Sequence, residues 1–79
     1  MNDNIIKELN EILFKSQSPI DLYMKNGMII YLEPGDSGFE VWREGSEEKF
    51  YTSVDSFLDD YYIDGKPFRQ LLCDIESLA

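Results

Sequence analysis

The feature that most constrains this chain is Asn26-Gly27, which lies inside the largely apolar segment "IDLYMKNGMIIYLE" at residues 20–33. An Asn-Gly pair between two apolar segments is the strongest short signal for a β-hairpin, because a type I′ turn requires positive φ at both central residues. A two-residue turn would place Lys25 opposite Met28. The segment is therefore expected to form two antiparallel strands.

Both faces of this expected hairpin are apolar. One face would hold Ile20, Leu22, Met24, Ile29 and Tyr31, and the other would hold Tyr23, Met28, Ile30 and Leu32. Side chains alternate between the two faces of a strand, so a hairpin that is apolar on both faces is typical of the centre of a sheet. We expect helices to cover one of its faces and a further element or a second chain to cover the other.

The remaining elements follow from periodicity. Apolar residues at helical spacing predict a helix over 5–15, and alternation predicts strands over 39–44 and 49–53. A short helix is expected over 54–61. Asp64-Gly65 would then break the chain before a last helix over 67–78, with Pro67 in its first turn.

These elements give the order α-β-β-β-β-α-α. The expected fold is α+β: a single small domain over residues 1–79, with an antiparallel meander sheet and helices packed on one face. Cys73 is the only cysteine, which excludes a disulfide within the chain. Self-association into a homo-oligomer, such as a homodimer, is the simplest remaining way for a domain of this size to bury more surface.

The net charge of the chain is strongly negative, and the acids are unevenly distributed along it. Sixteen acids against seven bases give −9, of which residues 1–32 contribute −1 and residues 33–79 contribute −8. Such a charge argues against direct binding of nucleic acid or of an anionic membrane surface. The start "MNDNIIKEL" does not have the pattern of a signal peptide, and the longest apolar run, "MIIYL", is too short to span a membrane, so a cytoplasmic protein is expected.

A calcium loop starting at Asp60 is the obvious metal hypothesis for so acidic a chain. Asp64 and Gly65 fit positions 5 and 6 of an EF-hand loop. However, Tyr62 stands at position 3, which needs an acidic or amide ligand, and Leu71 stands at position 12, which needs a bidentate glutamate. The chain contains no histidine, which removes the commonest transition-metal ligand and the usual general base. Neither a metal nor another cofactor is expected, and no catalytic residue is assigned.

Two groups of acids and one tryptophan are the candidate binding residues. The acids are Asp55, Asp59 and Asp60 on the expected short helix, and Glu44, Glu47 and Glu48 around the expected turn between the strands 39–44 and 49–53. Asp55 and Asp59 repel each other at i,i+4 spacing, with no lysine in that helix to relieve them. The helix acids form either a solvated face or a surface that is negative for a functional reason.

Trp42 is the candidate anchor for a partner. It would share a strand face with Glu40 and Glu44, and the neighbouring strand could bring Tyr51 beside it. The alternative is a core tryptophan under one of the helices. An aromatic anchor ringed by acids suits a basic protein surface that carries apolar pockets.

The chain is short, its negative charge is concentrated in residues 33–79, and it contains acidic runs such as "EGSEE" and "DSFLDDYYIDG". In its small size and acidity it resembles the small acidic inhibitors of phages and mobile elements, such as anti-CRISPR and antirestriction proteins that mimic DNA. The resemblance implies a non-enzymatic protein that occupies the nucleic-acid-binding surface of a nuclease or another nucleic-acid-binding protein. It rests on no motif, so it assigns no binding residue.

Two other functions remain open. The chain could be an accessory or structural module that homodimerises or docks on a larger complex, with its acids serving only solubility. An enzyme would need a deep pocket around a carboxylate with a displaced pKa, which a chain of 79 residues offers little room to build.

Overall fold

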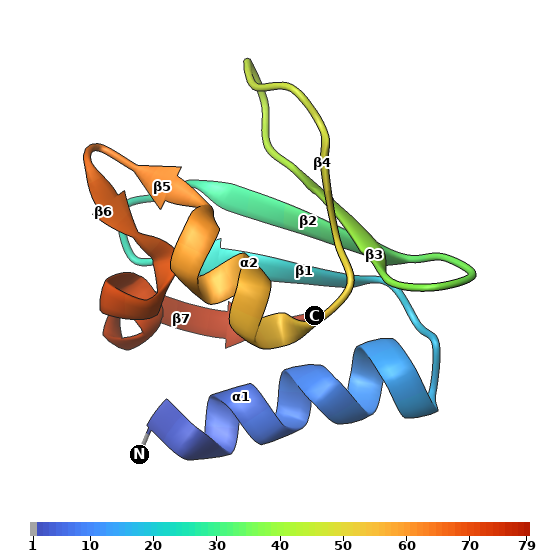
Figure 1. The fold of residues 1–79 in the computed structure, drawn as a ribbon. Coiled ribbons are helices and arrows are strands. Elements are labelled where there is room, and N and C mark those ends of the chain that lie inside the picture. The colour runs from blue at the N-terminus through green and yellow to red at the C-terminus, as the bar shows by residue number, and fades with distance from the viewer. Residues whose placement is uncertain (1) are drawn as a thin grey trace.

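The computed structural model describes residues 2–79, with side chains from residue 4 onward. Its centre is a five-stranded antiparallel sheet in the order β4-β3-β2-β1-β7, and the helices pack on one face of that sheet (Figure 1). A separate two-stranded ribbon pairs β5 with β6. The expected α+β class and the helices on one face of an antiparallel sheet are confirmed.

The elements have the following bounds. The helical ones are α1 (Asn2–Asn10), η1 (Glu11–Lys15), α2 (Val54–Asp60) and η2 (Phe68–Asp74). The strands are β1 (Ile20–Met24), β2 (Ile29–Pro34), β3 (Phe39–Trp42), β4 (Lys49–Tyr51), β5 (Tyr62–Ile63), β6 (Lys66–Pro67) and β7 (Ile75–Leu78). The π-helical turn η1 continues α1, so the first helix ends at Lys15 as expected.

The hydrophobic core lies between the helices and one face of the sheet. The sheet contributes alternate residues: Ile20, Leu22, Met24, Ile30, Leu32, Phe39, Val41 and Tyr51. Apolar residues of the helices, including Leu9, Leu13 and Phe57, pack onto them. Strands β1 to β4 therefore each have one buried side, and their other side faces away from the helices.

The β1–β2 hairpin differs from the expected one by a single residue of register. Leu22 pairs with Ile30, and the Gly27 amide donates to the Met24 carbonyl at 3.0 Å. Gly27 has a φ of +92° but Asn26 does not have a positive φ, so a three-residue loop replaces the type I′ turn. The predicted two-residue turn is wrong.

This change of register exchanges the two faces of β2. Ile30 and Leu32 join the core, while Ile29 and Tyr31 turn to the opposite face. The loop tolerates the longer form because the Asn26 side chain accepts a hydrogen bond from the Met28 amide at 3.0 Å.

Residues 67–78 do not form one helix, so that prediction is wrong. The 3₁₀ helix η2 ends at Asp74, and the next residues form β7, which pairs antiparallel with β1. The pairing includes Leu22 with Leu78, and the Asp21 and Ala79 amides each donate to the other residue's carbonyl at 3.1 and 3.0 Å. The backbone groups along β1 would otherwise lie at a sheet edge, and pairing with β7 satisfies them.

Asp64-Gly65 is the tight turn of a small β-hairpin. Both residues have positive φ, +54° and +80°, and Ile63 pairs with Lys66 across the turn. These are the signs of a type I′ turn, the geometry that was expected at Asn26-Gly27. The acidic stretch 59–68 is thus a helix end, a two-residue hairpin and the start of η2, where a joint between two helices was expected.

Candidate protein-binding surface

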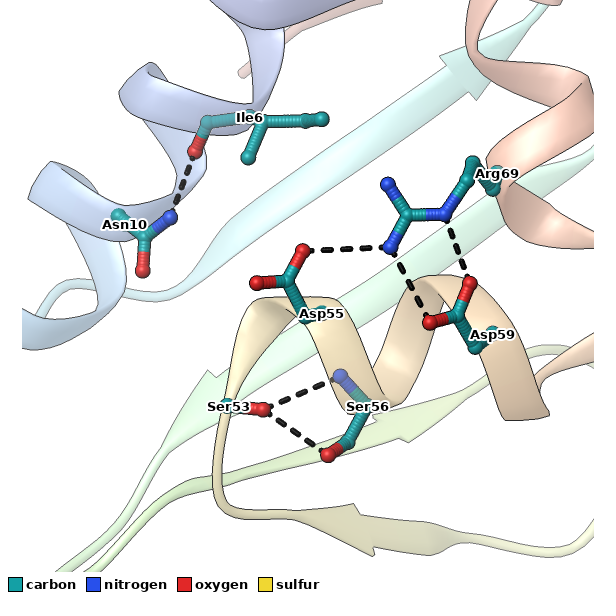
Figure 2. Close-up of polar contacts among 7 residues, drawn as sticks. All are labelled: Ile6, Asn10, Ser53, Asp55, Ser56, Asp59 and Arg69. Carbon is teal, nitrogen blue, oxygen red and sulfur yellow. Dashed lines mark hydrogen bonds and ion pairs between the residues drawn. The ribbon is translucent and has the colours of Figure 1, made fainter.

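Asp55 and Asp59 on α2 share one arginine from η2 (Figure 2). Ser53 caps the start of this helix, and its hydroxyl accepts a hydrogen bond from the Ser56 amide at 3.1 Å. Arg69 donates from Nε to Asp59 at 2.7 Å, and from one terminal nitrogen to Asp59 and Asp55 at 3.2 Å each. The guanidinium therefore relieves the repulsion between the two carboxylates, which no residue of α2 itself could do.

Asp60 faces a different neighbour. It accepts a hydrogen bond from the Tyr51 hydroxyl at 2.9 Å, and its carboxylate lies 3.9 Å from the Lys49 amine. Burial of the Tyr51 ring, together with this hydrogen bond to Asp60, raises the pKa of the Tyr51 hydroxyl. Asp60 thus joins the end of α2 to β4.

All three helix aspartates are therefore engaged within the monomer. Arg69 lies ten residues beyond Asp59 in the sequence, and the fold of η2 brings the two together. Helical spacing alone could not reveal this contact. The assignment of Asp55, Asp59 and Asp60 to a partner stays a prediction, and their contacts with Arg69, Tyr51 and Lys49 give each of them a structural role.

The Asp59–Arg69 pair predicts a pH dependence of stability. The hydrogen bond from Arg69 lowers the pKa of Asp59 below its ordinary value of 3.8. Its contribution to folding is complete above that ordinary value and is lost as the pH falls through the lowered one. Arg69→Gln should therefore lower the melting temperature slightly at neutral pH, with a smaller difference from the parent protein in strong acid.

Melting curves of the parent and Arg69→Gln proteins at a series of pH values test this expectation. Lys66→Gln removes an equal charge from an exposed position and serves as the control. Because the pair is exposed, added salt should shrink the effect. An Arg69→Gln deficit that grows on acidification would contradict the assignment.

Trp42 lies on the sheet face opposite the helices. The neighbouring Val41 is fully buried in the core, while Trp42 is partly exposed. Its ring stacks on Tyr31 of β2, with centroids 5.5 Å apart and an interplanar angle of 22°. The alternative of a core tryptophan under a helix is wrong. The prediction that Tyr51 lies beside Trp42 is also wrong, because Tyr51 pairs with Phe39 and points into the core.

Trp42 belongs to a surface that we call the open sheet face. It consists of the outward side chains of β1 to β4: apolar Tyr23, Ile29, Tyr31, Trp42 and Phe50, and acidic Asp21, Glu33 and Glu40. Phe50 is 51% exposed and the other four apolar residues are partly exposed. Within residues 2–79 no helix packs on this face. The sequence indicated that Trp42 and Glu40 share a face, but Tyr31 was missed because of the register error.

The loop between β3 and β4 carries Glu44, Glu47 and Glu48, all of them exposed, and projects beyond the sheet in Figure 1. Glu44 lines the same shallow depression as Ile29 and Tyr31, so the loop adjoins the open sheet face. Arg43 lines the same depression, but it forms no ion pair with these acids. Its guanidinium donates to the Tyr61 hydroxyl at 2.9 Å and lies 5.4 Å from the centre of that ring.

A more enclosed hollow of about 340 Å³ lies between the β1–β2 loop, the β5–β6 hairpin and η2. Its charged side chains are Lys25, Lys66, Asp64 and Asp74. The carboxyl group with a displaced pKa, Asp59, lies on exposed α2 and does not line this hollow. Among the described residues no group of three or more histidine, cysteine, aspartate or glutamate side chains is placed to hold a metal ion.

Comparison with known proteins yields no relative. No family model, curated protein or solved structure matches the chain. In the part of the chain that the structure describes, no helix has the length and apolar character needed to cross a membrane.

Proposed function

We propose that this protein is a non-enzymatic binding protein that occupies a basic surface of a nucleic-acid-binding protein, such as a nuclease, and thereby inhibits it. The observation that carries the proposal is the group of acids around the open sheet face. Asp21, Glu33 and Glu40 form no ion pair with any described residue, unlike Asp55, Asp59 and Asp60. Carboxylates without an internal partner remain available to the lysines and arginines of another protein.

The uneven charge supports the same proposal. Residues 33–79 contribute −8 and contain the exposed loop acids, so the acidic surface is concentrated on part of the chain. A partner that grips nucleic acid with rows of lysine and arginine offers the complementary charge. Binding should therefore compete with nucleic acid and weaken steeply as salt is added.

The test is competition for a nucleic-acid-binding partner. The protein would be immobilised, exposed to a bacterial lysate that contains nuclease complexes, and eluted with rising salt. Each captured enzyme would then be purified and its binding to DNA measured with and without this protein. Displacement of DNA by an equimolar amount supports the proposal. Capture of proteins that keep their full affinity for nucleic acid contradicts it.

Charge reversal gives a sharper version of the test. Glu47→Lys with Glu48→Lys should release the captured partner at markedly lower salt and leave the melting temperature nearly unchanged, because both side chains are exposed. Glu8→Lys with Glu11→Lys is the matched control, with the same change of net charge at exposed positions of the first helix. Equal losses in both variants would show that only net charge matters.

The second candidate function is an accessory module that forms a homodimer. The uncovered aromatic residues of the open sheet face favour it, since an exposed apolar face often marks an interface. Against it, a symmetric contact would bring Glu33 and Glu40 of one copy toward acids of the other. Sedimentation over a range of concentrations and salt tests it. A dimer that persists at low salt would favour this function.

A further inference from the structure

We propose that the open sheet face is the docking surface and that it receives an arginine-bearing segment of the partner, whose guanidinium groups stack on Trp42 and Tyr31 and pair with Glu40 and Glu33. This inference rests on the proposed function and deepens it, since it names the surface and the residue type that the surface recognises.

The first argument is an uncompensated repulsion in the sheet. Glu33 of β2 and Glu40 of β3 are direct cross-strand partners on the same face, and both are exposed. Like charges at directly opposite positions destabilise a sheet. No described lysine or arginine forms an ion pair with either carboxylate. Lys49 of the adjacent strand lies instead near Asp60 on the helical side. A cation supplied from outside would relieve this repulsion.

The second argument is the aromatic stack beside those acids. Glu40 and Trp42 are two residues apart on β3, so their side chains leave the same face about 7 Å from each other. Tyr31 is the direct cross-strand partner of Trp42 and stacks on it. The face therefore presents a stacked aromatic pair, with the outer side of each ring turned away from the other ring, next to paired carboxylates.

Arginine matches this combination better than lysine does. A guanidinium group is planar, stacks on aromatic rings and donates to a carboxylate through two parallel N–H groups, whereas an ammonium group is a strongly hydrated point charge. The protein contains an internal example of such recognition: one guanidinium, that of Arg69, binds two neighbouring carboxylates.

Two other occupants fit the face poorly. Single-stranded nucleic acid uses aromatic platforms set in positively charged grooves. Here the charged side chains of the face are Asp21, Glu33 and Glu40, and the guanidinium of Arg43 in the adjoining depression is already engaged by Tyr61. A second copy of this chain would bring acids against acids. The charge of the face thus selects a basic protein segment.

Binding at the open sheet face can be followed by tryptophan fluorescence, because Trp42 is the only tryptophan in the chain. An arginine-only peptide and a lysine-only peptide of equal length would be titrated into the protein at one salt concentration. Binding would be followed by Trp42 fluorescence and, independently, by calorimetry. We expect the arginine peptide to change Trp42 fluorescence and to bind about 5-fold more tightly than the lysine peptide, the scale of one or two cation–π contacts.

Glu40→Gln is the test variant, since it removes one acid of the exposed pair without removing volume. It should weaken binding of the arginine peptide by about 3-fold, as expected for one exposed ion pair, while the lysine peptide loses less. Glu8→Gln, at an exposed position of α1, is the control and should leave both affinities unchanged.

Three outcomes would overturn the inference. Peptide binding that depends on Glu47 and Glu48 and ignores Glu40 would place the contact on the loop and leave the proposed function standing. Binding of neither peptide would remove the proposed function as well. A dimer that Glu40→Gln strengthens would show that a second copy occupies the face.

Discussion

Phe57→Ala is expected to unfold a large fraction of the protein at room temperature. Phe57 is fully buried, and its ring centroid lies 4.9–5.9 Å from the ring centroids of four neighbours: Phe39, Tyr51, Tyr61 and Phe68. Truncating a buried phenylalanine to alanine costs about 3–5 kcal/mol. In a domain of this size a single hydrophobic core rarely gives a free energy of unfolding above about 3–5 kcal/mol, so the loss is comparable to the whole stability.

Urea unfolding followed by circular dichroism measures this effect. Tyr62→Ala is the matched control, because Tyr62 is also aromatic but 56% exposed, and its loss should cost less than about 1 kcal/mol. If the two variants unfolded at the same urea concentration, Phe57 would not be the centre of the core. A Phe57→Ala protein without a cooperative transition is the expected result.

The amphipathic helices and most strand positions could be predicted from local pattern, but the register of the central hairpin could not. Asn26-Gly27 is compatible with a two-residue turn and with a three-residue loop in which only Gly27 has positive φ. These alternatives place opposite sides of β2 in the core. Ile29 and Tyr31 on one side are as apolar as Ile30 and Leu32 on the other, so the pattern did not decide between them.

The end of the chain shows a second limit of local pattern. Phe68 and Leu72 follow helical spacing and are buried in η2, as expected. Ile75 and Leu78 extend the same spacing, yet they lie in β7 because β1 offers backbone groups for pairing. That partner lies about fifty residues earlier, a separation that local patterns do not report.

The candidate site was predictable in composition but not in its contacts. Trp42 and Glu40 share a face as alternation indicated, and the loop acids are exposed. The stack of Trp42 on Tyr31 depends on the hairpin register, and the neutralisation of Asp55 by Arg69 depends on how η2 packs against α2. These tertiary contacts engage the helix acids within the chain and leave the acids of the open sheet face without an ion pair to any described residue.

Gly38→Ala is the second change with a large expected effect. Gly38 is buried, and a Cβ at this position would overlap the Tyr51 carbonyl oxygen and lie 2.8 Å from the Phe50 ring. The ring can rotate away, but the carbonyl belongs to the backbone of β4. Alanine would therefore force β4 away from β3, at a cost toward the upper end of the roughly 1–3 kcal/mol usual for overpacking.

Gly35→Ala isolates this effect, because Gly35 lies in the same β2–β3 connection and also lacks a positive φ. Its added Cβ would meet only the Gly38 carbonyl oxygen, at 3.8 Å, an ordinary contact. Alanine there should be neutral or stabilise by about 0.4–1 kcal/mol through the unfolded chain. Thermal melts compare the two, and amide exchange should show opening confined to β4 in Gly38→Ala. Equal stability of the two variants would mean that β4 can shift without cost, and the outer strand carrying Phe50 would then be a loose edge.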